Sequence, residues 1–211
     1  MKTTLSILSI SILLFSCSSN QSSDNANDTN FYALTVGNSW VYKNYKLNET
    51  NVTYEETSVV DSISVVSKQT IKGETFYKVR RFTSGNEANI TFCNPNGEHF
   101  QFLRDSLGYL INSDGEIKHT YVNYEERLVQ ENNWGNIYEV LENGTEEINV
   151  ESGKFNCISS KRYAKDPDNQ LLPAEDKYYY ADGYGLIYDT QSFVSSDKPS
   201  IIRRLDAYNI N

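Results

Sequence analysis

The sequence predicts an all-β protein: a single antiparallel, strongly curved sheet or open barrel with little helix. Val, Ile, Thr, Tyr and Phe dominate the ordered stretches, whereas Met occurs once in 211 residues, and β-branched and aromatic residues favour strands. Asn or Asp followed by Gly recurs, and such pairs supply the positive φ of tight hairpin turns. The pairs are Asn96-Gly97, Asp114-Gly115, Asn143-Gly144 and Asp182-Gly183.

Apolar side chains recur at every second position between these turns, as Trp40 and Tyr42 and then Phe100 and Phe102 illustrate. This period indicates antiparallel strands with one face on the core. We expect ten to twelve strands, because some of the segments will merge or fail, and a sheet of that size curls, closes or splits. The segments are 38–46, 55–67, 74–83, 89–93, 98–104, 107–112, 116–122, 126–131, 136–142, 145–151, 155–164, 175–181, 185–189 and 200–207.

Two segments qualify this pattern. Asp61 interrupts the apolar face that Val59, Ile63 and Val65 would share, which predicts a half-buried or edge strand. No segment has helical periodicity over three turns, and a helix in place of a strand is most plausible within 122–132.

The amino-terminal residues predict export. Lys2 precedes an apolar run from Leu5 to Phe15 that is broken only by serines, the arrangement of a signal peptide. The run is shorter than the roughly 20 residues of a membrane-spanning helix. After it, residues 18–30 contain no large apolar side chain and cannot offset the entropy of ordering. We therefore expect a signal peptide at 1–16, a flexible tether at 17–30 and a single β domain at 31–211.

The tetrapeptide Leu14-Phe15-Ser16-Cys17 resembles a bacterial lipobox. The resemblance implies that the sulfur of Cys17 carries a diacylglycerol and that cleavage makes this residue the acylated amino terminus. Several acyl chains together anchor stably, since each buried methylene contributes about 0.8 kcal/mol. The residue after the cysteine is Ser18 and not Asp, which by analogy with lipoprotein sorting favours the outer membrane of the cell envelope. Whether the protein faces the periplasm or the cell surface is left open.

Three further stretches resemble a broad class of uncharacterised envelope lipoproteins and periplasmic proteins. The stretches are ALTVGNSWVYK (33–43), INVESGKFNCISSKRY (148–163) and YYYADGYGLIYD (178–189). The resemblance implies a curved antiparallel β domain and carries over no catalytic residue. The segment Ser152-Gly153-Lys154 departs from the class pattern, although Gly153 still suits a turn.

The charge balance argues against nucleic acid as a partner. The chain has 19 Lys and Arg against 28 Asp and Glu, a net charge of −9. Removal of residues 1–16 removes Lys2, so the balance becomes 18 against 28, or −10. Nucleic acids and anionic membrane surfaces select clustered basic residues. The pair Arg203-Arg204 is expected on the outer side of a strand.

The sequence offers no constellation of catalytic or metal-ligating residues. His99 and His119 are far apart and are expected at the surface, and no pair has metal-ligand spacing. The segment Asp166-Pro167-Asp168-Asn169 departs from a calcium loop and is better explained as an exposed turn. We therefore expect a protein that is not an enzyme and needs no metal or cofactor.

Six other side chains are candidates for a covalent or binding role. Cys93 and Cys157 could form a disulfide outside the cytoplasm, although only Cys157 has the inward phase of its segment. Tyr178, Tyr180, Tyr184 and Tyr188 could present a stacking surface on the concave side of the sheet, although tyrosine is also an ordinary residue of sheets.

These observations predict an envelope lipoprotein with a non-enzymatic binding or scaffold domain. Its partners would be the membrane, through the lipid, and a glycan, a hydrophobic ligand or an envelope protein. The alternative is a carrier that holds a lipid or another hydrophobic ligand in a curved sheet, and an envelope hydrolase is a weaker third reading. A contiguous apolar lining with no filling helix or plug would favour the carrier, and a polar, aromatic face would favour a glycan or protein partner.

Overall fold

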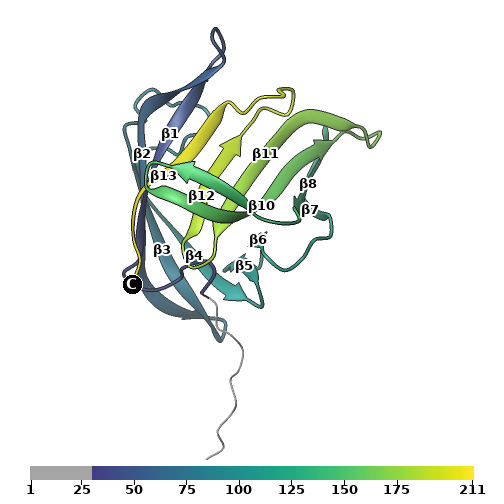
Figure 1. Ribbon diagram of the computed structural model, residues 1–211. Coiled ribbons are helices and arrows are strands. Elements are labelled where there is room, and N and C mark those ends of the chain that lie inside the picture. The colour runs from purple at the N-terminus through teal and green to yellow at the C-terminus, as the bar shows by residue number, and fades with distance from the viewer. Residues whose placement is uncertain (1–29) are drawn as a thin grey trace, which may run out of the picture.

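The computed structural model describes residues 30–211, in which thirteen strands form one antiparallel sheet and no segment is helical (Figure 1). The strands are β1 (Ser39–Asn48), β2 (Thr53–Ile71), β3 (Glu74–Ser84), β4 (Gly97–Ser106), β5 (Tyr109–Asn112), β6 (Ile117–Thr120), β7 (Arg127–Asn132), β8 (Gly135–Leu141), β9 (Glu146–Val150), β10 (Gly153–Lys165), β11 (Leu171–Ala181), β12 (Gly185–Gln191) and β13 (Ile201–Asn209). The predicted all-β, curved-sheet class is confirmed. The signal peptide, Cys17 and all of the expected tether except Asn30 lie outside the described residues.

Hydrogen bonding orders the strands β6-β5-β4-β3-β2-β1-β13-β12-β11-β10-β8-β7, and β9 pairs with β10. The last strand, β13, therefore joins the two halves of the sheet by pairing with both β1 and β12. The sheet curls but is not closed, because within residues 30–211 no ladder joins β6 to β7. A side chain crosses this seam instead: Arg127 Nη1 donates to the Ile117 carbonyl oxygen at 3.2 Å.

The structure decides between two alternatives for one expected strand and corrects another. The strand that contains Asp61 is half-buried and is not an edge strand, since β2 pairs with β1 on one side and β3 on the other. The expected strand at 89–93 is a series of turns in the β3–β4 connection, where Asn89 and Phe92 have positive φ. Asparagine tolerates a positive φ, so Asn89 is compatible with a turn. The alternation of apolar residues in this segment does not reveal that the backbone turns.

Two of the four predicted turn dipeptides close hairpins. Asp114-Gly115 connects the paired strands β5 and β6, and Asp182-Gly183 connects β11 and β12. The pair Asn143-Gly144 joins β8 to β9, which do not pair with each other but pair with different parts of β10. The remaining pair ends the long connection into β4.

The segment before β1 fills part of the hollow that the curled sheet forms. Phe31, Tyr32, Ala33 and Leu34 are all buried, and the Phe31 ring stacks on that of Tyr121 with centroids 4.2 Å apart. A Cβ on residue 185, where φ is +80°, would lie 3.2 Å from the carbonyl oxygen of Tyr32. Glycine at that position thus lets β12 start directly beneath this segment.

The hairpin of β9 and β10 covers the other face of the sheet. It crosses β12 and β13 (Figure 1), where Val150, Phe155 and Cys157 are buried in the same apolar cluster as Tyr179. At the end of the crossing, Tyr45 Oη donates to Glu151 Oε1 at 3.0 Å. The expected turn at Gly153 is confirmed, because this residue pairs with Val150 across the hairpin.

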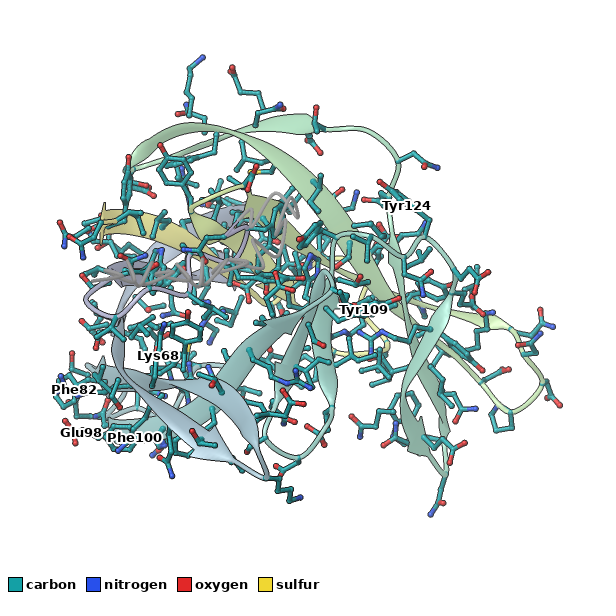
Figure 2. All side chains as sticks on the ribbon, turned by 90° about the horizontal axis from the view of Figure 1, so that it is seen from below. Lys68, Phe82, Glu98, Phe100, Tyr109 and Tyr124 are labelled. Carbon is teal, nitrogen blue, oxygen red and sulfur yellow. The ribbon has the colours of Figure 1, made fainter. Side chains whose placement is uncertain are left out.

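The outer face of β3 and β4 carries exposed aromatic rings beside charged side chains. Phe82 and Phe100 are 41% and 49% exposed, and they lie with Glu98 at the periphery of the molecule (Figure 2). The Lys78 ammonium lies 4.2 Å from the centre of the Phe100 ring. Polar and apolar groups thus share this face, whereas the inner face of the same strands lines a cavity.

Candidate ligand-binding cavity

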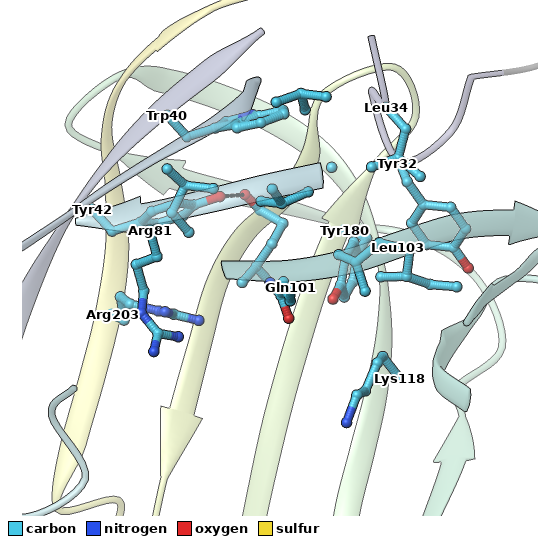
Figure 3. A pocket seen from close by; sticks show the side chains of 16 residues that line it. Tyr32, Leu34, Trp40, Tyr42, Arg81, Gln101, Leu103, Lys118, Tyr180 and Arg203 are labelled. Carbon is cyan, nitrogen blue, oxygen red and sulfur yellow. Dashed lines mark hydrogen bonds between the residues drawn. The ribbon is translucent and has the colours of Figure 1, made fainter. Parts of the chain in front are cut away.

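A cavity of about 350 Å³ lies on the inner face of the sheet, beneath the segment that precedes β1 (Figure 3). This volume is within the range of small-molecule sites, roughly 300–1,000 Å³. The lining residues are Tyr32, Leu34, Trp40, Tyr42, Ile63, Val65, Val79, Arg81, Gln101, Leu103, Leu110, Lys118, Tyr180, Gly185, Leu186 and Arg203.

The apolar part of the lining follows from strand alternation. Val65 lies opposite Val79 in the β2–β3 ladder, so both side chains point to the inner face. Trp40, Leu103 and Leu110 extend this surface across β1, β4 and β5, and all of them are buried. The cavity therefore has a continuous apolar wall that five neighbouring strands supply.

Hydrogen bonds hold the aromatic part of the wall in place. Tyr42 Oη donates to the Leu186 carbonyl oxygen at 2.8 Å (Figure 3), and Trp40 Nε1 donates to the Tyr184 carbonyl oxygen at 2.8 Å. Tyr32 Oη donates to the Gly108 carbonyl oxygen, also at 2.8 Å. Burial raises the pKa of Tyr32 and of Tyr42. These phenols therefore stay neutral, and their rings have fixed positions before any ligand enters.

A buried ion-pair cluster adjoins the apolar wall. Arg203 Nε and Nη2 donate to the two oxygens of Asp189 at 2.8 Å each, a bidentate geometry that is among the strongest of its kind. Asp61 lies on the other side of Arg203, with Nη1 and Oδ2 3.9 Å apart. Burial opposes the charge of Arg203, but Asp189 and then Asp61 outweigh it and raise the pKa of the guanidinium.

Neutral donors satisfy Asp61, which is fully buried. Thr83 Oγ1 donates to Oδ1 at 2.5 Å, Asn94 Nδ2 to the same oxygen at 3.1 Å, and Asn44 Nδ2 to Oδ2 at 3.2 Å. The expectation for Arg203-Arg204 is therefore half wrong. Arg204 faces outward to Glu151, whereas Arg203 faces inward because Asp189 and Asp61 compensate its charge.

Arg81 also lines the cavity, but unlike Arg203 it forms no ion pair with a carboxylate of the described residues. It lies opposite Ile63 on the inner face. Its Nε is buried without a hydrogen-bond partner, and no carboxylate among the described residues forms an ion pair with it. Burial lowers the pKa of this guanidinium and Arg203 lowers it further, whereas Asp61 raises it. A guanidinium nevertheless stays protonated in proteins.

A second buried cluster lies near the seam of the sheet. Glu139, which is 3% exposed, accepts from Arg127 Nη2 at 2.7 Å and from Arg162 Nη2 at 2.5 Å. Its neighbour His119 is 1% exposed, and its ring stacks on Tyr180 with centroids 4.0 Å apart. Burial, with Arg162 and Arg127 adding to it, lowers the pKa of His119 to about 3. This histidine is therefore neutral and structural.

The structure corrects the expectation that both histidines lie at the surface. His99 is partly exposed and contacts the Pro95 carbonyl oxygen at 3.1 Å, but His119 is buried. Its Nδ1 lies 3.4 Å from Ser160 Oγ, in a place that no substrate reaches because Ser160 is also 1% exposed. Within residues 30–211, no group of three His, Cys, Asp or Glu could hold a metal ion.

The four candidate tyrosines do not form one surface. Tyr180 lines the cavity, and Tyr178 lies on the same inner face, where Arg162 stacks over its ring at 4.6 Å. Tyr188 is on the opposite face, with its ring 5.5 Å from that of Tyr179. Tyr184 lies in the β11–β12 turn and is 37% exposed. Opposite residues 179 and 180 of β11, strand β12 contains one extra residue, Ile187, and this bulge changes the phase of β12, which alternation in the sequence cannot show.

The candidate disulfide is absent, because Cys93 and Cys157 are both free thiols. Cys157 is fully buried in β10, and burial, with Glu146 adding to it, raises the pKa of this thiol. Cys93 lies in the β3–β4 connection, where burial, with Asp61 adding to it, raises the pKa of its thiol. The two thiols thus have different surroundings, at the outer hairpin and at the inner charged cluster.

Asp166 forms the expected turn between β10 and β11. Its Oδ1 accepts from the backbone N–H groups of Asp168 and Gln170, at 3.0 and 2.8 Å. The carboxylate therefore closes the turn itself, as aspartate commonly does.

The three stretches that resemble envelope lipoproteins meet in space. Trp40 from the first donates to the Tyr184 carbonyl of the third, and the rings of Tyr184 and Phe155, from the second, have centroids 5.2 Å apart. Of these three residues only Trp40 lines the cavity. The sequence patterns did not single out Arg81, Gln101 or Tyr32. For Arg81 a signal existed, since alternation along Arg80-Arg81 requires one of the two to face inward.

The fold is similar to that of two solved structures. One is a “putative exported protein with YmcC-like fold” from Bacteroides fragilis, with a TM-score of 0.50 and 10% identity over 83% of this chain and 96% of that chain. Another is a “putative lipoprotein” from Parabacteroides distasonis, with a TM-score of 0.45 and 14% identity over 85% of this chain and 98% of that chain. No family model and no curated protein matches the chain. At these identities the similarity concerns the fold alone.

Helices long and apolar enough to cross a membrane do not occur in the part of the chain that the structure describes.

Proposed function

We propose that this chain is a lipoprotein of the cell envelope, anchored to the outer membrane through Cys17, whose β domain binds a small amphipathic molecule without transforming it. The observation that carries the binding role is the cavity, in which a continuous apolar wall ends at a cationic group. Pockets with an apolar lining and a few placed polar groups are typical ligand sites.

The anchor rests on the lipobox-like sequence before Cys17 and agrees with the exported character named for the Bacteroides fragilis protein of similar fold. A Cys17→Ser variant should remain uncut or leave the membrane fraction, because it has no thiol to acylate. Fractionation of cells that express the wild type and the variant measures this. Processing and membrane retention like those of the wild type would contradict the assignment.

The lining favours a hydrophobic ligand over a glycan. Leu34, Val65 and Val79 line the cavity, whereas the tyrosines expected to stack on sugar rings lie on different faces. The inaccessible Ser160–His119 contact also supports a binding role over an envelope hydrolase. Residues 31–34 fill part of the hollow, but a cavity of about 350 Å³ remains beneath them, so a carrier of a small ligand is the version of the binding role that we adopt.

Trp40 gives a direct assay. It lines the cavity, and the other tryptophan, Trp134, is 43% exposed. A version of the chain that begins at Ser18 keeps the whole sheet and carries no lipid, and Trp134→Phe leaves Trp40 as its sole tryptophan. Titration with decanol should change the Trp40 emission and saturate. If neither decanol nor a charged probe of the same chain length gave a saturating response, binding in this cavity would be refuted.

A further inference from the structure

We propose that the ligand is a monocarboxylate with an unbranched apolar tail, and that Arg81 is the residue that selects its headgroup. This inference rests on the proposed function and specifies the ligand class of the same cavity. It follows from the charges around the cavity, from the shape of the guanidinium and from the volume.

The charged side chains that line the cavity are all cations: Arg81, Lys118 and Arg203. Two of them already have partners. Arg203 forms its bidentate pair with Asp189, and Lys118 Nζ lies 2.7 Å from Glu116 Oε2. Arg81 remains, with its Nε buried and unpartnered. A buried donor without a partner costs about 1–3 kcal/mol, and a ligand that accepts from it removes this cost.

A carboxylate matches this group in geometry and in charge. A guanidinium presents parallel N–H donors that fit the two oxygens of a carboxylate. Within residues 30–211 no ion pair engages Arg81, so its guanidinium can accept one carboxylate. The buried carboxylates of Asp61 and Asp189 beside Arg203 would repel a dianion more strongly than a monoanion. A phosphate monoester is therefore a poorer match than a carboxylate.

The remaining lining accommodates the tail. At roughly 30 Å³ for each non-hydrogen atom, a value taken from liquid water, the 350 Å³ of the cavity holds about twelve such atoms. Decanoate has this size. Trp40, Val79 and Leu110 form the apolar wall, and Gln101 and Lys118, both exposed, mark the side on which the cavity opens. In Figure 3 the Arg81 and Lys118 side chains point toward the same side of the cavity.

Titrations of the Ser18-onward chain, read from Trp40, test the inference with four probes of equal chain length. Decanoate should bind at least tenfold more tightly than decanol, because a charge-assisted hydrogen-bonded pair with Arg81 should increase the affinity by a factor of roughly 10–100. Decyltrimethylammonium should bind more weakly than decanol, and decyl phosphate more weakly than decanoate. These comparisons use only the wild-type cavity, so they hold even if a variant folds poorly.

Substitutions of Arg81 and Arg80 in β3 test whether Arg81 is the residue that causes the preference for decanoate over decanol. Arg81→Met should remove the preference for decanoate over decanol while decanol still binds, and Arg81→Lys should keep part of it. The matched control is Arg80→Met, because Arg80 lies next to Arg81 on the opposite face, where it pairs with Glu98. This control should keep the full preference.

The outcomes separate the two proposals. Equal binding of decanol and decanoate would overturn the carboxylate assignment and leave the proposed function intact. A preference for decyl phosphate, or one that survives in Arg81→Met, would also overturn it. Failure of every probe to bind would refute the proposed function itself.

Discussion

Removal of the Arg203 side chain should destabilise the protein more than removal of any neighbouring charge. In an Arg203→Met variant, Asp189 keeps its buried position, at 2% exposure, but loses both of its 2.8 Å hydrogen bonds from Arg203. Breaking a buried ion pair by removing one partner costs about 3–5 kcal/mol, because the other charge remains without compensation.

The structure narrows this range. The Arg203 side chain is 17% exposed, so some solvent reaches the pair, and Asp61 retains its three neutral donors. We therefore expect a loss near the lower limit, about 3 kcal/mol. For a domain of this size, 1 kcal/mol corresponds to about 2–4 °C in Tm, so the midpoint should fall by roughly 10 °C.

Urea unfolding followed by circular dichroism and tryptophan emission measures the free energy of unfolding. The matched control is Arg204→Met, which removes the next arginine on the outer face, where the pair with Glu151 is about 30% exposed. Exposed pairs contribute about 0–1 kcal/mol. A double variant, Arg203→Met with Asp189→Asn, should recover part of the loss, since it leaves no unpaired charge at that position. If the two single variants lie within 1 kcal/mol of each other, the inner cluster does not have the energetic role inferred here.

Three further perturbations test other parts of the fold. Burial raises the pKa of Asp176 to about 6; the charged form then costs stability above that pH, and the cost disappears as the pH falls toward 4. Asp176→Asn should thus raise the free energy of unfolding by about 2 kcal/mol at pH 7.5 and by nothing near pH 4, and an equal gain at both values would contradict this. Gly85→Ala should cost at least 2 kcal/mol more in urea unfolding than Gly73→Ala, because both have positive φ but only a Cβ at Gly85 would collide with a carbonyl oxygen of β2; equal losses would refute the collision. Burial raises the pKa of Cys93 to about 11 and that of Cys157 to about 12, so a thiol reagent at pH 8 should react slowly with the folded Ser18-onward chain and count two thiols in guanidinium chloride, whereas a count of none would restore the disulfide.

The sequence was sufficient for the fold class and for most strands, because alternation and Asn-Gly or Asp-Gly turns are local properties of the chain. Trp40 and Tyr42 share a phase and do face the cavity together. Arg203 also alternates with Ile201 and Leu205, which are buried, yet its charge led us to expect it on the outer face. Local pattern was the better guide, since buried charge is tolerated wherever the fold supplies a partner.

What the sequence could not supply is contact between distant segments. The burial of His119 depends on Ser160 and Tyr180, which reach it only because the sheet curls until β6 approaches β10 and β11. Arg81 is a candidate because no carboxylate of residues 30–211 forms an ion pair with it, and this can be seen only once the positions of all neighbouring strands are known.

The open seam of the sheet has a consequence for association between molecules. Exposed strand edges are templates for pairing with other chains, and short strands with basic side chains blunt them. Here the two terminal strands of the hydrogen-bonded order, β6 and β7, have four and six residues. The curl brings these edges toward each other, and the Arg127 guanidinium occupies the Ile117 carbonyl that an incoming strand would use. The domain would thereby resist edge-to-edge polymerisation with its own copies, even at high local concentration.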